Sequence, residues 1–185
     1  ADNASADRIN DIRLSAIKSE LFEFEGVISG RFNIEENRLP SPRILKVKAG
    51  AWVMFTKNDI NHRWVNGTTG TVIKICEQFI TVQTDKGTFD VKRESWETLQ
   101  YIYDEDSGKI VTETIGSYTQ FPLMLAWAIT IHKSQGKTLD KVFIDLGNGA
   151  FAQGQVYVAL SRCKTLEGIT LKKPVCLSDI KVDAV

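Results

Sequence analysis

The sequence has few of the residues that build metal sites, disulfide scaffolds or membrane spans. Its two histidines, His62 and His132, are too few for the common zinc signatures. Its three cysteines, Cys76, Cys163 and Cys176, are odd in number and form no CxxC pair, which favours a reducing compartment. No stretch approaches the roughly 18 apolar residues of a membrane helix, and no signal pattern opens the chain. We therefore expect a cytoplasmic protein with no metal ligands of its own and no membrane partner.

Net charge is absent as well. Basic and acidic side chains number 23 each, and the 43% hydrophobic content is ordinary for a globular protein. This balance excludes a chain-wide polycation that would grip nucleic acid without specificity. A local basic patch is still compatible with zero net charge, because residues 51–118 carry 7 basic and 10 acidic side chains whereas residues 119–185 carry 8 and 5. An asymmetry of this size is more often an ordinary solvated surface than a binding face.

The middle of the chain has the pattern of short strands separated by polar turns. The apolar and β-branched runs fall at 51–57, 70–76, 79–84, 87–91, 101–104 and 109–114. Asn66-Gly67, 85–87 and 106–108 supply the turn residues between them. Short strands at this spacing predict a small antiparallel β-barrel or meander.

The two flanks of this middle differ from it. Residues 1–19 predict a helix with Ile9, Ile12, Leu14 and Ile17 near one face, and residues 20–45 predict short strands and loops. After Pro122, an apolar run predicts a buried helix over 123–131. A strand at 142–144, a helix at 153–162 and a strand at 169–171 follow. The predicted fold class is α/β, interrupted by an inserted small antiparallel β-barrel.

The sequence argues against a phosphate loop at 136–138. Gly136-Lys137-Thr138 lacks the glycine that such a loop needs five positions earlier, because position 131 is Ile. Such a loop must also open a helix, whereas a strand is predicted next. The sequence therefore has no recognisable nucleotide-hydrolysing loop.

Two segments carry more polar chemistry than packing requires. Residues 130–136 gather two hydroxyls, an imidazole, an ammonium and a glycine, all suited to phosphate oxygens, although a polar helix cap would look similar. In the second segment a predicted helix brings Gln155, Ala159 and Arg162 to one side. The Arg162 guanidinium suits a phosphate, although an arginine that ends a helix usually compensates the helix dipole.

Together these segments resemble a family. Residues 126–138 resemble the fifth conserved motif of superfamily-one DNA helicases of the Pif/RecD class, and residues 155–162 resemble the sixth. Residues 50–54 and 65–70 are similar to segments that those helicases place just before and into an inserted small barrel. Residues 3–10 resemble, more weakly, the tail of the fourth motif.

The resemblance implies the second RecA-like domain of an ATP-dependent 5′-to-3′ DNA helicase, with a barrel of the Src-homology type inserted. Residues 1–65 would begin that domain, residues 66–116 would form the barrel, and residues 117–185 would complete the domain. Because the family places its phosphate loop and metal-holding acidic motif in the first domain, ATP with Mg²⁺ would be bound mainly there. A chain without that domain should not hydrolyse ATP alone.

The resemblance also implies residue roles. Arg162 would match the arginine that reaches the γ-phosphate, Gln155 would help to hold the phosphates, and Gly136 with Lys137 would face the nucleotide.

The expected partners are single-stranded DNA, ATP and the N-terminal RecA-like domain of the same full-length chain. Thr130, His132, Lys133 and Ser134 would touch the single-strand backbone. The expected location is the cytoplasm, with the nucleoid if the source is bacterial.

Two other readings stay open. One is a non-enzymatic module in which the barrel and the α/β part only bind a partner, and the other is a nucleotide kinase using residues 136–138. In the barrel, Trp64, Trp96, Tyr101 and Tyr103 could stack on bases, but aromatic residues in small barrels are more often core. The excess of acidic residues there argues against a strong grip on phosphates.

Overall fold

The structure is a computed structural model that describes residues 3–32, 34–35, 38–104, 108–147 and 149–181. The chain packs as two units. One unit comprises Leu14–Leu125, and the other comprises Ala1–Arg13 together with Ala126–Val185. The domain boundaries expected from the sequence, at 65/66 and 116/117, stay a prediction beside this division by contacts.

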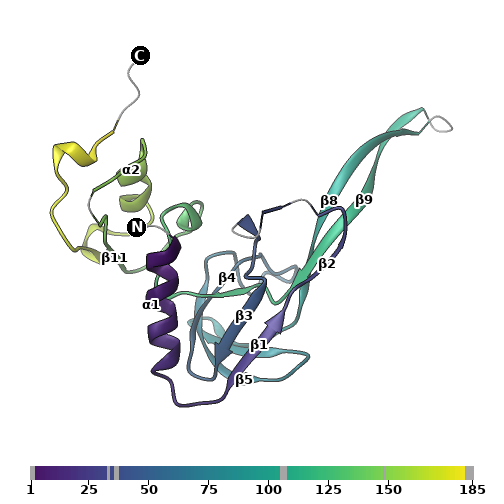
Figure 1. The fold of residues 1–185 in the computed structure, drawn as a ribbon, viewed down its shortest axis with the longest axis horizontal. Coiled ribbons are helices and arrows are strands. Elements are labelled where there is room, and N and C mark those ends of the chain that lie inside the picture. The colour runs from purple at the N-terminus through teal and green to yellow at the C-terminus, as the bar shows by residue number, and fades with distance from the viewer. Residues whose placement is uncertain (1–2, 33, 36–37, 105–107, 148, 182–185) are drawn as a thin grey trace. The chain divides into compact units, whose positions relative to one another are not determined.

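The described residues of the unit Leu14–Leu125 form ten strands (Figure 1). They are β1 (Leu21–Glu25), β2 (Val27–Gly30), β3 (Ile44–Lys48), β4 (Trp52–Phe55), β5 (Thr69–Ile75), β6 (Ile80–Thr84), β7 (Gly87–Val91), β8 (Glu94–Asp104), β9 (Lys109–Gln120) and β10 (Leu123–Leu125). Their sheets have the orders β10-β4-β5-β6-β7, β2-β9-β8 and β1-β3, and every pair is antiparallel. The strands expected from the sequence are therefore confirmed.

The five-stranded sheet contributes a large part of the apolar core. Phe55, Ile80 and Val82 are fully buried, as are Phe121 and Leu123 beside them. Trp64 stacks on Phe55 with ring centroids 4.5 Å apart, so this tryptophan is core, as sequence reasoning favoured.

The turns follow their sequences. Thr84 pairs with Gly87 across Asp85-Lys86, and Gly87 has a φ of 139° that a residue with a side chain rarely adopts. The expected turn at 106–108 lies largely outside the described residues.

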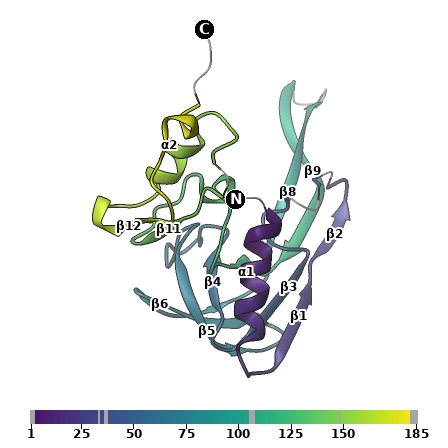
Figure 2. The same cartoon turned by 60° about the vertical axis from the view of Figure 1, so that its left-hand side comes forward.

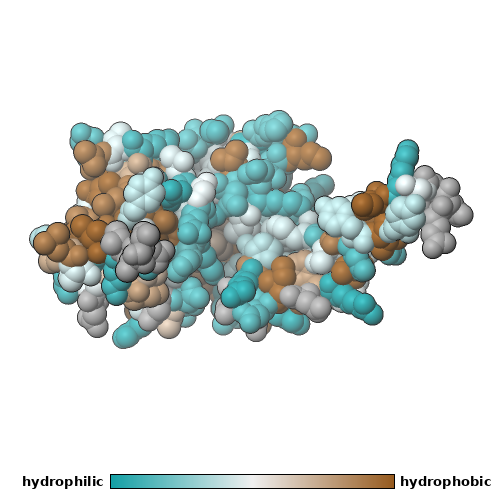
Figure 3. All heavy atoms as spheres, turned by 90° about the horizontal axis from the view of Figure 1, so that it is seen from above, coloured by the Kyte–Doolittle hydropathy of each residue, from teal (hydrophilic) through white to brown (hydrophobic). Residues whose placement is uncertain are grey.

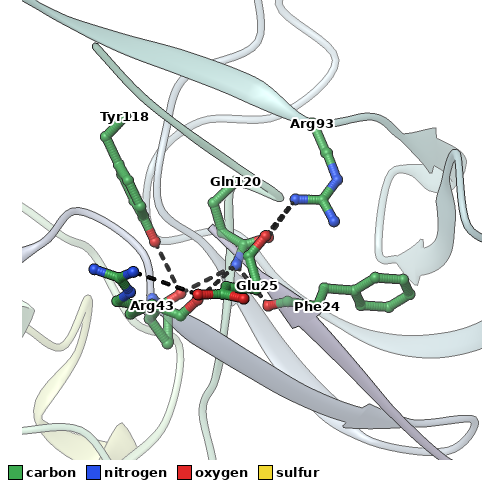
Figure 4. A network of polar contacts seen from close by, with 7 residues as sticks. Phe24, Glu25, Arg43, Arg93, Tyr118 and Gln120 are labelled. Atoms are coloured by element: carbon green, nitrogen blue, oxygen red, sulfur yellow. Dashed lines mark hydrogen bonds and ion pairs between the residues drawn. The ribbon is translucent and has the colours of Figure 1, made fainter. Parts of the chain in front are cut away.

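A buried polar network ties β9 to the strands beside it (Figure 4). Gln120 is fully buried, and its side-chain amide donates to the carbonyl of Phe24 at 2.8 Å and accepts from the amide of Phe121 at 2.9 Å. The hydroxyl of Tyr118 donates to the carbonyls of Ser41 and Pro42, at 3.0 and 2.9 Å. These bonds tie two side chains of β9 to backbone groups of β1 and of the segment before β3.

The other unit contains little regular secondary structure. It holds α1 (Asn3–Ser15), whose last residues belong to the first unit, and α2 (Gln155–Leu160), together with the parallel pair β11 (Val142–Ile144) and β12 (Ile169–Leu171) (Figure 2). Three 3₁₀ turns complete it: η2 (His132–Ser134), η3 (Leu166–Gly168) and η4 (Leu177–Asp179). No helix among the described residues is long and apolar enough to cross a membrane. The mixed α/β class is confirmed.

The helix expected over 123–131 is wrong. Leu123–Leu125 form β10, which pairs with Val53–Phe55 of β4, and no helix follows before the 3₁₀ turn at His132. An apolar run has no period that separates a buried strand from a buried helix, and here the open edge of β4 decides.

The expected apolar face of the first helix is wrong at Ile9 and Ile12, which are 46% and 59% exposed, and right at Leu14, which is buried. The buried face carries Ala6, Asn10 and Leu14 at intervals of four. Asn10 takes part because its side-chain amide and the backbone of Ala128 exchange two hydrogen bonds, at 2.9 and 3.0 Å.

Candidate functional site

The polar segment at 130–138 is a tight turn closed by its own hydrogen bonds. The amide of Ser134 donates to the carbonyls of Thr130 and Ile131, and its hydroxyl donates to the carbonyl of Ile131 at 2.6 Å. The Thr130 hydroxyl accepts from the amide of Lys133 at 3.4 Å. Thr130 and Ser134 are each only 6% exposed. Both hydroxyls therefore shape the turn from inside.

The turn presents an imidazole and an ammonium to solvent. His132 and Lys133 are exposed, at the start and middle of η2. Gly136 follows with a φ of 70°, and nothing lies within 4 Å of the place where its Cβ would be. Lys137 is buried, and this burial lowers the pKa of its ammonium. No helix begins within 137–147, all of them described residues, which agrees with the argument against a phosphate loop there.

The second segment forms α2, as expected. Gln155 is buried, and its side-chain oxygen accepts from the amides of Phe151 and Ala152 at 2.9 and 3.4 Å, so it holds the turn that leads into the helix. At the far end the Nε of Arg162 donates to the carbonyl of Val158 at 3.1 Å, and one Nη donates to the Ser161 hydroxyl at 2.9 Å. The partly exposed Arg162 guanidinium is thus folded back over the last turn of α2.

Backbone pairing joins the end of α2 to the end of the polar segment. The amide of Leu139 donates to the carbonyl of Arg162 at 2.8 Å, and the amide of Lys164 donates to the carbonyl of Leu139 at 3.0 Å. Ser134 and Arg162 line one pocket, together with Ile129, Ile131, Leu139, Val142, Phe143, Ile144, Asp145 and Ala159. The structure therefore brings Ser134 and Arg162 together, whereas Gln155, Gly136 and Lys137 are not in that lining.

Charge at this pocket is balanced by an ion pair. The Asp145 carboxylate accepts from the Lys172 ammonium at 2.7 Å and from the amide of Gly147 at 2.9 Å. These two contacts hold the pKa of Asp145 below its usual range. Among the described residues, no three histidine, cysteine, aspartate or glutamate side chains group as metal ligands would.

Two positioning residues were not found from the sequence. Asp179 is buried and accepts from the amides of Ala150 and Cys176 at 3.0 and 2.9 Å, which lowers its pKa and ties η4 to the loop before α2. Nothing in the local pattern marks this aspartate. Asn10 lies within segment 3–10, whose weak resemblance to the tail of the fourth motif was the sequence signal there; in the structure it pairs with the backbone of Ala128.

Comparisons with known proteins show which proteins this chain is similar to. No protein-family model matches the chain. A Pif1 ATP-dependent DNA helicase of Bdellovibrio bacteriovorus is 39% identical over 171 residues, which cover 90% of this chain and 37% of the relative. The human PIF1 helicase is 35% identical over 163 residues, covering 86% of this chain and 24% of the relative.

Solved structures agree. Pif1 from a Bacteroides species in complex with ADP-AlF4 superposes with a TM-score of 0.85 at 41% identity, over 97% of this chain and 40% of that one. Bacteroides Pif1 bound to single-stranded DNA gives 0.73 at 41% identity, over 99% and 42%. This chain is a Pif1 homologue. It spans 24–42% of the length of the Pif1 relatives named above. Because the similarity covers 86–99% of this chain, the resemblance to Pif/RecD-class helicases drawn from the two motifs is confirmed.

Proposed function

We propose that this Pif1 homologue supplies the second half of an ATP-dependent 5′-to-3′ DNA helicase motor. It would contribute an arginine to the nucleotide and cationic contacts to single-stranded DNA. The backbone link between Leu139 and Arg162 carries the proposal, because it fixes the end of α2 beside the polar turn. The relatives support it, since the Bdellovibrio protein is an ATP-dependent DNA helicase and the two Bacteroides Pif1 structures hold ADP-AlF4 or single-stranded DNA.

On the nucleotide side, Arg162 is the residue that would contact a nucleotide held by another domain. Its planar guanidinium is always charged and partly exposed. Reaching a γ-phosphate requires it to release the Val158 carbonyl and the Ser161 hydroxyl. ATP and Mg²⁺ would be bound mainly by the N-terminal RecA-like domain of a longer chain. Gly136 and Lys137 would face the nucleotide.

The remaining nucleotide residue, Gln155, would act through the loop before α2, because its side-chain oxygen already binds two amides there.

On the DNA side, His132 and Lys133 would contact backbone phosphates, because both are exposed on a turn that needs no ligand to hold its shape. Thr130 and Ser134 are buried, so they would contribute by keeping that turn closed.

The nucleotide role is tested in a longer chain that carries the N-terminal RecA-like domain. Arg162→Ala should lower DNA-stimulated ATP turnover by roughly 10³–10⁵-fold, as loss of a trans arginine does, while single-strand binding and the melting temperature stay near wild type. Lys164→Ala is the matched control, since Lys164 is a neighbouring exposed cation that pairs with Asp140. Full turnover by the Arg162 variant would instead support the non-enzymatic module.

The DNA role is tested in the chain itself by fluorescence anisotropy with a labelled oligothymidylate. Binding should be weak and should fall as salt rises, and Lys133→Ala should reduce the slope of log K against log salt by about one. Binding that ignores salt would contradict a backbone contact. The same sample should show neither ATP turnover nor tight Mg-ATP binding, and either one would favour a kinase-like site.

A further inference from the structure

The strands β8 and β9 run on together beyond the rest of their sheet as a two-stranded ribbon (Figure 1). The third strand, β2, pairs only with Gly116–Thr119 of β9. After a register shift at Thr98/Leu99, the pairs from Leu99↔Thr114 to Asp104↔Lys109 have no further strand beside them among the described residues. An isolated two-stranded ribbon is marginally stable in water, so an added contact would stabilise it.

One face of this ribbon is apolar and exposed. Side chains alternate along a strand, so Leu99, Tyr101 and Tyr103 share a face, and Ile110 lies opposite Tyr103 on the same side. Their exposed fractions are 51%, 75%, 66% and 71%. Sequence reasoning favoured a core position for both tyrosines, and for these two it is wrong. Figure 3 shows hydrophobic and pale aromatic side chains gathered on the projecting ribbon at the right of the view.

A contiguous group of this kind differs from singly scattered apolar residues, which need no explanation. Clustered apolar and aromatic side chains on a surface mark an interaction site.

The charge of the ribbon decides what can bind there. Residues 94–115 contain six acidic side chains and one lysine, and Glu94 pairs with Lys57 at 3.2 Å. A surface with this surplus repels nucleic-acid phosphates, so it disfavours DNA stacked on the tyrosines. It also disfavours a second copy pairing ribbon to ribbon, because like charges would face each other. A basic partner is the complement.

The edge of the ribbon gives that partner its geometry. β8 ends the order β2-β9-β8, so its outer edge presents backbone donors and acceptors that no strand of the described chain pairs. An extended segment can add to such an edge through main-chain hydrogen bonds, while alternate side chains contact the face.

We propose that the outer edge of β8 from Leu99 to Tyr103 binds an extended, lysine- or arginine-rich segment of another protein as an added strand. Tyr101 and Tyr103 would cover its apolar side chains, and the carboxylates of the ribbon, Glu113 among them, would pair with its cations. The proposal does not depend on the ATP or DNA chemistry of the polar turn.

The probe is a labelled peptide of about ten residues that alternates lysine and valine, with binding to the full chain followed by anisotropy. Binding is expected for this peptide and not for its glutamate–valine counterpart. The double substitution Tyr101→Ser and Tyr103→Ser should weaken binding roughly tenfold or more, as loss of aromatic anchors does. Tyr157→Ser is the matched control, because Tyr157 on α2 is also 75% exposed. N-methylation of alternate peptide amides should weaken binding similarly.

Each other outcome overturns the proposal. Equal binding by the N-methylated peptide, or by the double tyrosine variant, would show charge attraction without strand addition. Loss of oligothymidylate binding in the tyrosine variant would assign the face to DNA, and loss of a concentration-dependent dimer in sedimentation would assign it to a second copy. Absence of peptide binding in a chain extended by the N-terminal RecA-like domain would show that the ribbon is covered within its own protein. If the double variant melts early, Glu113→Lys keeps both tyrosines and should weaken binding of the lysine peptide, because it lowers the acidic surplus of the ribbon; unchanged binding would overturn the proposal.

Discussion

Replacing Gln120 by leucine tests whether the buried network of β9 is obligatory. The glutamine side chain is fully buried, and Figure 4 shows it between the backbone of Phe24, the 42–43 segment and the guanidinium of Arg93. Leucine fills a similar volume but leaves the carbonyl of Phe24 and the amide of Phe121 without this partner. Each buried orphan costs about 1–3 kcal/mol, and the better burial of leucine returns part of that. We expect a loss of about 3 kcal/mol in the free energy of unfolding.

The assay is urea unfolding followed by tryptophan fluorescence, with the midpoint converted at constant m. Gln120→Glu should cost more than leucine, because its second oxygen would face carbonyls that now accept a hydrogen bond. Gln83→Leu is the matched control, since Gln83 is exposed on β6 and its change should stay within about 0.5 kcal/mol. A leucine variant at position 120 that is as stable as this control would refute the reasoning.

Three further substitutions test single contacts. Hydrogen bonds from Arg63 lower the pKa of Asp59 from 3.8 to about 2. The stabilising contribution of Asp59 is therefore complete above pH 4 and is lost as the pH falls towards 2. Asp59→Asn should lower the urea midpoint at pH 7 and flatten this acid dependence. Thr56→Val should be neutral or should raise the midpoint, because the Thr56 hydroxyl is the buried side-chain group without a partner among the described residues. Asp179→Asn should speed hydrogen exchange at the amide of Ala150, measured by mass spectrometry, and an unchanged rate would show that the loop does not depend on this carboxylate.

The sequence was most informative where local chemistry decides the structure. The loop at Asp85-Lys86 and the strands around it follow from the positive φ that Gly87 tolerates and from alternating β-forming residues. The short helix before Arg162 was predictable for the same reason, since its residues keep a helical spacing without needing distant partners.

Prediction failed where distant partners decide. The run at 123–125 became a strand because β4 offered an edge, and Tyr101 and Tyr103 are exposed because their strands leave the sheet, which no periodicity can indicate. In the candidate site, the exposure of Lys133 could be expected from its charge. The burial of Lys137 could not, because it depends on packing rather than on spacing.

The two halves of the candidate site differ in how much they must rearrange to bind a ligand. The turn that carries His132 and Lys133 is closed by internal bonds, so a DNA strand would bind a turn that is already ordered, at little cost in conformational entropy. Arg162 is held by two hydrogen bonds to its own helix end, so a phosphate must first displace them. An isolated chain should therefore bind single-stranded DNA measurably and bind nucleotide hardly at all. The amide of Leu139 donates a hydrogen bond to the Arg162 carbonyl, so a movement of Arg162 would also move the backbone that follows the turn. Through this link, docking of a second domain with its nucleotide could alter the grip on DNA.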